Sequence, residues 1–170
     1  LLLSQQYLRT DMLTPFMKSV TFLGNGGWFW ILCAVVLLAV PKTRKTGYAA
    51  ALSLIFGAIV TNLLLKNIVA RPRPFAEIEA LIPMITKPKD FSFPSGHTTA
   101  SFAVALVMLR MLPKKFGIPA VVLAALVAFS RLYLGVHYPT DVLTGFVIAL
   151  VGSMLSVWIV RTKPEDKQVH

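Results

Sequence analysis

The stretch Phe91-Ser92-Phe93-Pro94-Ser95-Gly96-His97-Thr98 leads directly into an apolar run at residues 98–112. Proline suits the first turn of a helix, a serine offers a hydroxyl, and a glycine lets the backbone approach a ligand closely. The first N–H groups of the helix have no partner within the helix and can bind an anion. The stretch therefore predicts a phosphate site with Ser95, Gly96 and His97 at the start of a helix. A Ser-Gly turn that only caps the helix is the simpler alternative.

The composition is typical of a membrane protein. The 170 residues are 56% hydrophobic and 14% charged, whereas a soluble domain carries roughly 25% charged residues. The net charge of +10 would suit nucleic acid, but the basic residues stand in short clusters at the ends of apolar runs. Anionic lipid headgroups are therefore the expected partners, and nucleic acid is not. Cys33 lies within an apolar run and is expected to pack there.

Five apolar runs approach the length of about 20 residues that crosses a bilayer. Basic turns join the first run to the second and the third to the fourth, so each pair should form a helical hairpin. Gly145, Gly152 and Ser153 should let the fifth run approach other helices closely. The expected fold class is an all-α integral membrane helical bundle, forming one domain over residues 1–170. The runs are residues 27–40, 47–65, 98–112, 116–134 and 142–160, and the first and third are short.

Residues 1–23 carry an apolar stripe at helical spacing, which predicts an amphipathic helix that lies along the membrane surface and packs on the bundle. Thr14-Pro15 is typical of an N-cap followed by a proline at the first helical position, which would divide this segment into two short helices. The glycine-rich turn at residues 24–27 would end the second helix. Because the sequence opens on Leu1 rather than methionine, a sixth span before it stays open.

Two further stretches carry charged residues at fixed distances. Lys66 is followed after six residues by Arg73-Pro74, and Ser130-Arg131 is followed after five residues by His137 and after three more by Asp141. Together with the Pro-Ser-Gly-His turn, these stretches resemble the signature of the type 2 phosphatidic acid phosphatase superfamily. That family includes membrane lipid phosphatases, glucose-6-phosphatase and soluble vanadium haloperoxidases. Three matching motifs in order are far more specific than any one of them alone.

The basic residues of the loops indicate an orientation. Nine lysines and arginines fall on the face that holds the loops after the first and third runs and the C-terminal end, and eight fall on the other face. If Lys66, Arg73 and Arg131 are set aside as functional, five remain on that second face. The positive-inside tendency then places the first face in the cytoplasm. All three motifs would lie on the outer face, and a bacterial cell membrane is the expected location.

The cations of these motifs suit a phosphate group. Arg73 and Arg131 offer planar forks and Lys66 a point charge, while the Ser-Gly turn adds donors. Taken singly, a lysine that snorkels at a helix end and arginines that contact headgroups are simpler readings. Lys66 and Arg73 are seven residues apart, so they would share one face if the segment is helical. Arg71 is expected to lie outside the site.

The resemblance implies different roles for the two histidines. His137 is the nucleophile that forms a phosphohistidine, and Asp141 accepts one ring N–H so that the other nitrogen is free. His97 is the general acid for the leaving oxygen and later the base for water, unless it only caps the helix. A divalent metal on His97, His137 and Asp141 is disfavoured because the cations beside them would repel it. We therefore expect no metal and no cofactor.

The sequence predicts a metal-independent membrane phosphatase that hydrolyses a phosphomonoester or pyrophosphate of a lipid. The N-terminal arrangement is similar to that of bacterial undecaprenyl pyrophosphate phosphatases, which favours this substrate over phosphatidic acid or phosphatidylglycerophosphate. The apolar runs disfavour a haloperoxidase, and the intact His137 and Asp141 pair disfavours a non-catalytic lipid-phosphate carrier. The loop at residues 74–90 is either an amphipathic flap that gates the site or a loop packed over the bundle. The sequence does not indicate an oligomeric state.

Overall fold

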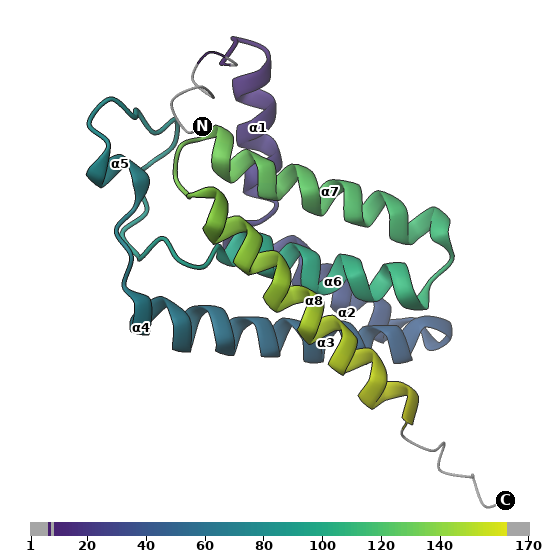
Figure 1. The fold of residues 1–170 in the computed structure, drawn as a ribbon. Helices are drawn as coiled ribbons and strands as arrows, with labels where there is room; N and C mark the ends of the chain where they lie inside the picture. The colour runs from purple at the N-terminus through teal and green to yellow at the C-terminus, as the bar shows by residue number, and fades with distance from the viewer. Residues whose placement is uncertain (1–6, 8, 163–170) are drawn as a thin grey trace, which may run out of the picture.

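The computed structural model describes residues 7 and 9–162, and this part of the chain is helical with no strand (Figure 1). The all-α prediction is confirmed. Three short segments connect helices: the 3₁₀ turns η2 (Asn25–Gly27) and η3 (Pro41–Thr43), and the π-helix η4 (Ile59–Leu65). The α-helices are α1 (Leu13–Phe22), α2 (Trp28–Ala39), α3 (Arg44–Ala58), α4 (Lys66–Val69), α5 (Pro74–Glu77), α6 (Gly96–Met111), α7 (Lys114–Tyr133) and α8 (Pro139–Thr162).

Three helical stretches of the described chain are long and apolar enough to cross a bilayer: Pro41–Glu77, Lys114–Tyr133 and Pro139–Thr162. A fourth span is possible if α1 and the segment Asn25–Ala39, which are bent by 44° at their junction, cross together. Each of the five expected runs forms a helix, and the first and third, α2 and α6, are indeed short. Residues 9–162 therefore contain three to four helices that can span a bilayer, with α6 as a buried helix among them.

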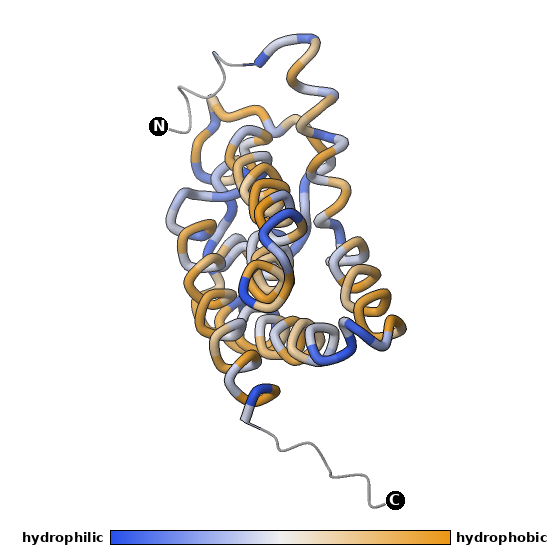
Figure 2. Tube along the Cα trace, turned by 90° about the vertical axis from the view of Figure 1, so that its right-hand side faces the viewer, coloured by the Kyte–Doolittle hydropathy of each residue, from blue (hydrophilic) through white to orange (hydrophobic). Residues whose placement is uncertain are grey.

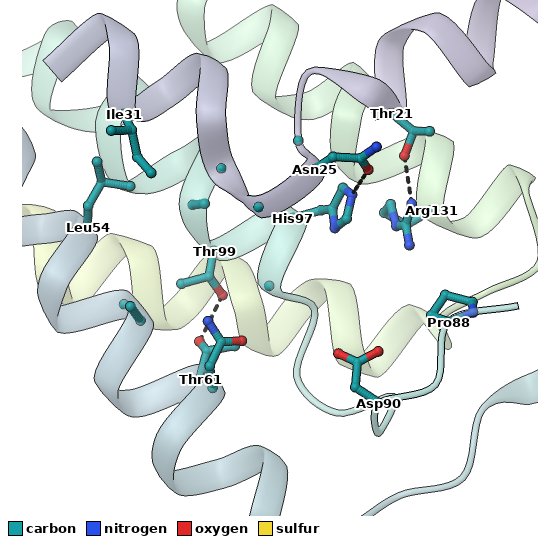
Figure 3. Close-up of a pocket in the computed structure, with 18 of the residues that line it drawn as sticks. Thr21, Asn25, Ile31, Leu54, Thr61, Pro88, Asp90, His97, Thr99 and Arg131 are labelled. Carbon is teal, nitrogen blue, oxygen red and sulfur yellow. Dashed lines mark hydrogen bonds between the residues drawn. The ribbon is translucent and has the colours of Figure 1, made fainter. Parts of the chain in front are cut away.

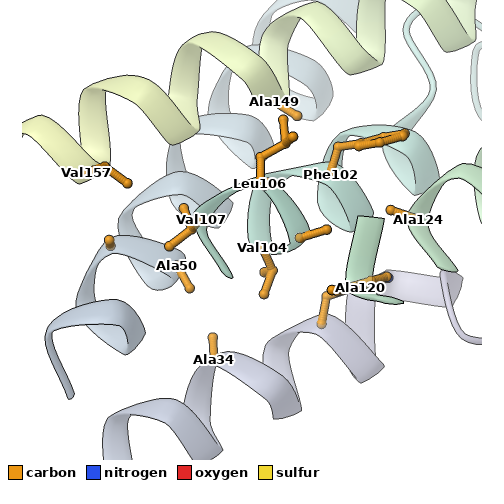
Figure 4. Close-up of a cluster of buried hydrophobic side chains, with 14 of the residues drawn as sticks. Ala34, Ala50, Phe102, Val104, Leu106, Val107, Ala120, Ala124, Ala149 and Val157 are labelled. Carbon is orange, nitrogen blue, oxygen red and sulfur yellow. The ribbon is translucent and has the colours of Figure 1, made fainter. Parts of the chain in front are cut away.

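Helix α6 is the centre of the bundle, and it contacts α2, α3, α7 and α8 (Figure 4). Residues 103–107 in its middle are buried. The neighbouring helices present alanines to it, and such small side chains let helix backbones approach closely. Because other helices surround α6, it does not need the apolar length of a lipid-facing span. The alanines around it include Ala34, Ala50, Ala120, Ala124 and Ala149.

Both expected hairpins are present, one formed by α2 with α3 and one by α6 with α7. Helix α8 packs across α3 and α6. A Cβ atom on Gly145 would lie 2.8 Å from the carbonyl oxygen of Ser95, and one on Gly152 would lie 2.6 Å from the ring of Phe56. The prediction that these glycines permit close contact is confirmed. The close approach at Gly145 brings the first turn of α8 against the start of α6, where the N–H of Ser95 donates to the carbonyl of Asp141 at 3.0 Å.

The outward faces of the helices are apolar, while hydrophilic residues gather at the turns (Figure 2). Soluble proteins rarely expose apolar surface of this extent, and hydrocarbon is its natural surrounding. Cys33 packs beside the core, as expected. The protein is an integral membrane protein. Its exposed apolar side chains include Val36, Ile118, Val122, Leu143, Val147, Val151, Met154 and Trp158.

Helix α1 packs on α7 through one face, on which Met17 and Val20 are buried. Thr14 was expected to be an N-cap, but Met12 holds that position and the Thr14 hydroxyl instead bonds to the hydroxyl of Tyr133 at 2.9 Å. A buried tertiary partner thus takes the side chain away from the helix end. The glycine-rich turn follows α1, as predicted. Residues 1–6 and 8 of the expected amphipathic segment lie outside the described residues.

Candidate active site

A cavity of about 930 Å³ opens at the end of the bundle where α4, α6, α7 and the loop before α8 meet (Figure 3). Of the eight residues that the sequence assigns to the site, six line this cavity and come from five different segments. The other two, Ser95 and Asp141, are fully buried behind its wall. The lining residues are Lys66, Arg73, Gly96, His97, Arg131 and His137.

His137 stands between a carboxylate and a guanidinium. Its Nδ1 lies 3.3 Å from Oδ2 of Asp141, and its Nε2 lies 3.3 Å from Nη1 of Arg73. Because a carboxylate only accepts and a guanidinium only donates, these partners place the proton on Nδ1 and the lone pair on Nε2. The ring is 2% exposed and lines the cavity. The nitrogen with the lone pair is therefore on the side of the cations.

The His137 imidazole is held in its neutral form. Burial lowers the pKa of His137 to about 4, and the positive charges of Arg131 and Arg73 act in the same direction, against the hydrogen bond to Asp141. The ordinary histidine pKa is about 6.5. The ring therefore has an available lone pair at any pH well above 4.

Asp141 lies in the first turn of α8 and is fully buried. Its Oδ2 accepts hydrogen bonds from the Ser92 hydroxyl, from Nδ1 of His137 and from the N–H of Tyr138. Its Oδ1 accepts one from Nη1 of Arg71 at 2.9 Å. Four donors compensate the burial of this charge. Arg71, which was expected to lie outside the site, does not line the cavity but touches the carboxylate from behind.

Asp90 is a part of the site that the sequence reasoning missed. Its carboxylate contacts both Nζ of Lys66 and Nη2 of Arg73, the latter at 2.7 Å. Partial burial by itself would raise the pKa of Asp90, but the hydrogen bonds and charges of Lys66 and Arg73 bring it to about 2. An anion thus already sits between the two cations, in an arrangement that also suits phosphate oxygens.

Lys66 and Arg73 do not share a helical face, because the segment between them is not helical throughout. Helix α4 ends at Val69, and Ala70 has left-handed backbone angles, with φ of 46°. Arg73 follows in extended backbone. The two side chains meet because both reach the same carboxylate from different segments.

The start of α6 combines a cap with a cavity wall. The Ser95 hydroxyl accepts from the N–H of Thr98 at 3.4 Å and from its hydroxyl at 3.0 Å, so in this geometry it caps the helix and does not line the cavity. Gly96 does line it. Nε2 of His97 lies 2.9 Å from Oδ1 of Asn25, in the glycine-rich turn after α1 (Figure 3). A Cβ atom on Gly24 would lie 2.6 Å from the His97 ring, so the absence of a side chain there makes room for the histidine.

Arg131 is a buried charge that forms no salt bridge within the described part of the chain. The side chain is 2% exposed, and its Nη1 donates to the Thr21 hydroxyl at 2.7 Å (Figure 3). Its Nε has no hydrogen-bond partner among the described residues. An anion that accepts hydrogen bonds from the unpaired N–H groups of a buried guanidinium strongly stabilises its charge. Arg131 lines the cavity, so an anion in the cavity can reach its guanidinium.

The cavity continues from these polar groups into an apolar arm between α2 and α3. Ile31 and Leu54 stand in this arm, away from His97 and Arg131 (Figure 3). A cationic end joined to an apolar arm is complementary to an amphiphile with an anionic head. The arm is lined by Ile31, Ala34, Val35 and Leu38 of α2 and by Ala51, Leu54, Ile55 and Ala58 of α3.

The loop at residues 74–90 is packed over the bundle for much of its length. Leu81 is buried, and the N–H of Met84 donates to the carbonyl of Leu134 at 3.2 Å. Phe75, Met84 and Ile85 pack against the cluster at the end of α7. This geometry favours the packed loop over the gating flap. Residues 85–88 also line the cavity, so the loop forms part of its rim.

Comparison with known proteins places the chain among phosphatases. The PAP2 superfamily matches residues 46–165. The chain is 36% identical over 150 residues to an undecaprenyl-diphosphatase of Sulfolobus acidocaldarius, covering 87% of this chain and 72% of the relative. It is 37% identical over 143 residues to an undecaprenyl-diphosphatase of Bacillus subtilis, covering 83% and 72%. The crystal structure of a transmembrane PAP2-type phosphatidylglycerolphosphate phosphatase from Bacillus subtilis matches with a TM-score of 0.77 at 28% identity, covering 96% of this chain and 84% of that one.

Proposed function

The chain belongs to the PAP2 superfamily, and we propose that it removes the terminal phosphate of a polyprenyl diphosphate through a phosphohistidine on His137. The undecaprenyl lipid is the favoured substrate, because two relatives at 36% and 37% identity carry that activity in their names. One observation carries the proposal. A neutral histidine paired to a buried carboxylate faces three cations in a cavity that continues into an apolar arm.

The cations prepare the phosphate for attack. A phosphate ester resists nucleophiles because its oxygens are negatively charged, so the site must neutralise that charge first. The Nε of Arg131 has no partner among the described residues, and Arg73 and Lys66 can exchange contacts with Asp90 for contacts with the substrate. The N–H groups at the start of α6, where Gly96 lines the cavity, add donors.

The covalent step uses both histidines. Nε2 of His137 attacks phosphorus, the bond from phosphorus to the leaving oxygen breaks, and His97 gives that oxygen a proton. The Asp141 carboxylate stabilises the positive charge that develops on the His137 ring. In the second step water attacks phosphorus, His97 takes a proton from the water, and the bond to Nε2 breaks to release inorganic phosphate.

The reaction is proposed to need no metal ion. The described residues contain no group of three or more His, Cys, Asp or Glu side chains placed to hold one. The two carboxylates of the site, Asp90 and Asp141, are already paired with cations. The guanidinium and ammonium groups supply the charge that a divalent ion would supply elsewhere.

The apolar arm supports a lipid substrate. A phosphate bound beside His97 has the arm directly available for the hydrocarbon chain, between α2 and α3. The similarity to a phosphatidylglycerolphosphate phosphatase favours that lipid as the second candidate. Both substrates place an anionic head in the polar end and a hydrocarbon chain in the arm.

We also propose a bacterial cell membrane as the location, with the cavity on its outer face. The basic turns at η3 and at the start of α7 lie at the opposite end of the bundle from the site (Figure 1). The positive-inside tendency favours a cytoplasmic position for those turns. Residues 1–170 are proposed to act as one phosphatase domain, because the cavity draws on residues from Lys18 to His137.

Phosphate release from purified protein in detergent tests the function. Undecaprenyl diphosphate, phosphatidylglycerophosphate and phosphatidic acid are compared in the presence of EDTA, with His137→Ala as the inactive control. We expect the diphosphate to give the highest kcat/KM and EDTA to have no effect. Activity that chelator abolishes and magnesium restores would contradict the metal-free mechanism. Binding of all three lipids without phosphate release would indicate a carrier.

A further inference from the structure

Arg71 lies behind the His137 and Asp141 pair and is held by three groups of the neighbouring segment. Its Nη1 donates to Oδ1 of Asp141 at 2.9 Å and to the hydroxyl of Thr140 at 2.8 Å. Its Cζ lies 3.7 Å from the centre of the Tyr138 ring. The side chain is 33% exposed and does not line the cavity. It therefore cannot act on the substrate by direct contact.

Tyr138 connects Arg71 to a further carboxylate. Its hydroxyl donates to Oε2 of Glu77 in α5 at 2.8 Å, and its N–H donates to Oδ2 of Asp141. Partial burial and the hydrogen bond to Glu77 raise the pKa of Tyr138 to about 12, so the ring stays a neutral phenol. The guanidinium of Arg71 thus rests on a ring whose own position is fixed at both ends. This arrangement limits the directions that Arg71 can take.

The two oxygens of Asp141 are not equivalent. Oδ2 accepts from Ser92, His137 and Tyr138, whereas among the described residues Arg71 alone donates a side-chain hydrogen bond to Oδ1. Without Arg71, Oδ1 would be a buried oxygen with no protein partner, and rotation of the carboxylate would be favoured. A partial rotation toward another donor would move Oδ2 away from Nδ1 of His137 and weaken that hydrogen bond.

We propose that Arg71 is a positioning residue, which holds Asp141 with Oδ2 against Nδ1 of His137 and so keeps Nε2 directed toward the phosphate. This inference rests on the proposed function, because it requires His137 as the nucleophile. Arg71 acts in the covalent step and not in substrate binding. Its loss should therefore lower kcat and leave KM nearly unchanged.

The positive charge of Arg71 has a second effect. The charged and titratable groups that face His137 are Arg73 from its loop, Arg131 from α7, His97 from α6 and Asp141 from α8. Arg71 neutralises part of the Asp141 charge. When it is removed, the protonated form of His137 becomes less unfavourable, and the acid limb of kcat/KM should move to higher pH.

The test compares Arg71→Ala, Arg71→Lys and Tyr138→Phe in detergent, with a short-chain prenyl diphosphate. Groups that orient a functional side chain from behind are typically worth 10- to 100-fold in activity. We expect Arg71→Ala to lose roughly that factor in kcat, with KM within about twofold and the acid limb moved upward by about one pH unit. Arg71→Lys should keep the wild-type acid limb and recover part of kcat. Tyr138→Phe keeps the ring beneath the guanidinium but removes its hydrogen bond to Glu77, so it should lose less of kcat than Arg71→Ala and keep the wild-type acid limb.

Three results would overturn the inference: wild-type kcat in a folded Arg71→Ala protein, a raised KM at wild-type kcat, or lost activity with an unmoved acid limb in both Arg71 variants. If Arg71→Ala does not fold, Arg71→Gln, which keeps a hydrogen-bond donor but lacks the charge, should still move the acid limb to higher pH while losing less of kcat, and an unmoved acid limb in it would overturn the inference. The wild-type protein separates this inference from the proposed function. If it forms no phosphohistidine, the proposed function fails; if it does and Arg71→Ala matches it, only the role of Arg71 fails.

Discussion

Replacing Asp141 by asparagine should impair the covalent step without emptying the phosphate site. The amide has one accepting and one donating end, whereas the native carboxylate accepts four hydrogen bonds. The lower-cost orientation keeps oxygen toward Ser92, His137 and Tyr138, and turns the NH₂ group toward the guanidinium of Arg71. A repulsive donor pair then replaces a charge-assisted hydrogen bond.

The magnitude follows from the bonds that change. A hydrogen bond to a charged group contributes about 1.5–3 kcal/mol, so the lost contact to Arg71 should destabilise the fold by about that amount. In the variant, Nδ1 of the phosphorylated His137 ring also donates to a neutral amide oxygen instead of the charged carboxylate, so it loses a charge-assisted hydrogen bond. Since 1.4 kcal/mol is about tenfold, kcat should fall by roughly 10- to 150-fold.

Phosphate release at saturating substrate measures this change, and Asp90→Asn is the matched control. Asp90 is also paired with cations, but it does not contact His137. The control should change KM more than kcat, because it frees Lys66 and Arg73. A kcat of Asp141→Asn within threefold of wild type, at unchanged protein stability, would refute the assigned role of the carboxylate.

Three further predictions concern pH, the apolar arm and orientation. Because the pKa of His137 is lowered to about 4 and the neutral ring is the nucleophile, kcat/KM, corrected for substrate ionisation, should fall as the pH drops through 4 and not near 6.5. Ala51→Phe should reduce kcat/KM at least tenfold for undecaprenyl diphosphate and spare a short-chain diphosphate; equal losses on both would contradict the arm. In intact cells that express a variant with Cys33 replaced by alanine, Lys87→Cys should react with an impermeant thiol reagent. Labelling of Lys114→Cys instead would show that the protein has the opposite orientation in the membrane.

Much of the architecture could be predicted because it depends on local patterns. Apolar runs, basic turns and glycines are visible in the sequence, and they indicated the two hairpins and the close contact at Gly145. The spacing of His137 and Asp141 predicted a histidine just before the start of a helix and, in its first turn, a carboxylate that can accept the ring N–H. The short lengths of α2 and α6 were also visible, but the central position of α6 depends on packing among all the helices.

The contacts made by loops could not be predicted in this way. Asp90 and Arg71 lie in segments without helical or strand periodicity, and their partners are 17 to 70 residues away. Lys66 and Arg73 would share a face only in a continuous helix, and Ala70 ends the helix between them. Thr14 similarly looked like a cap until its distant partner, Tyr133, was known.

The most direct test of the account is to trap the phosphorylated enzyme. His97→Ala, with His137 and Asp141 intact, is exposed briefly to an activated aryl phosphate, whose leaving group needs no proton. We predict that phosphate becomes attached to His137 through an acid-labile, base-stable bond and is lost slowly, because the water has no base. A His137→Ala protein should carry no label. Label on residue 97 in the His137→Ala protein, or turnover that persists without any phosphohistidine, would contradict the central claim.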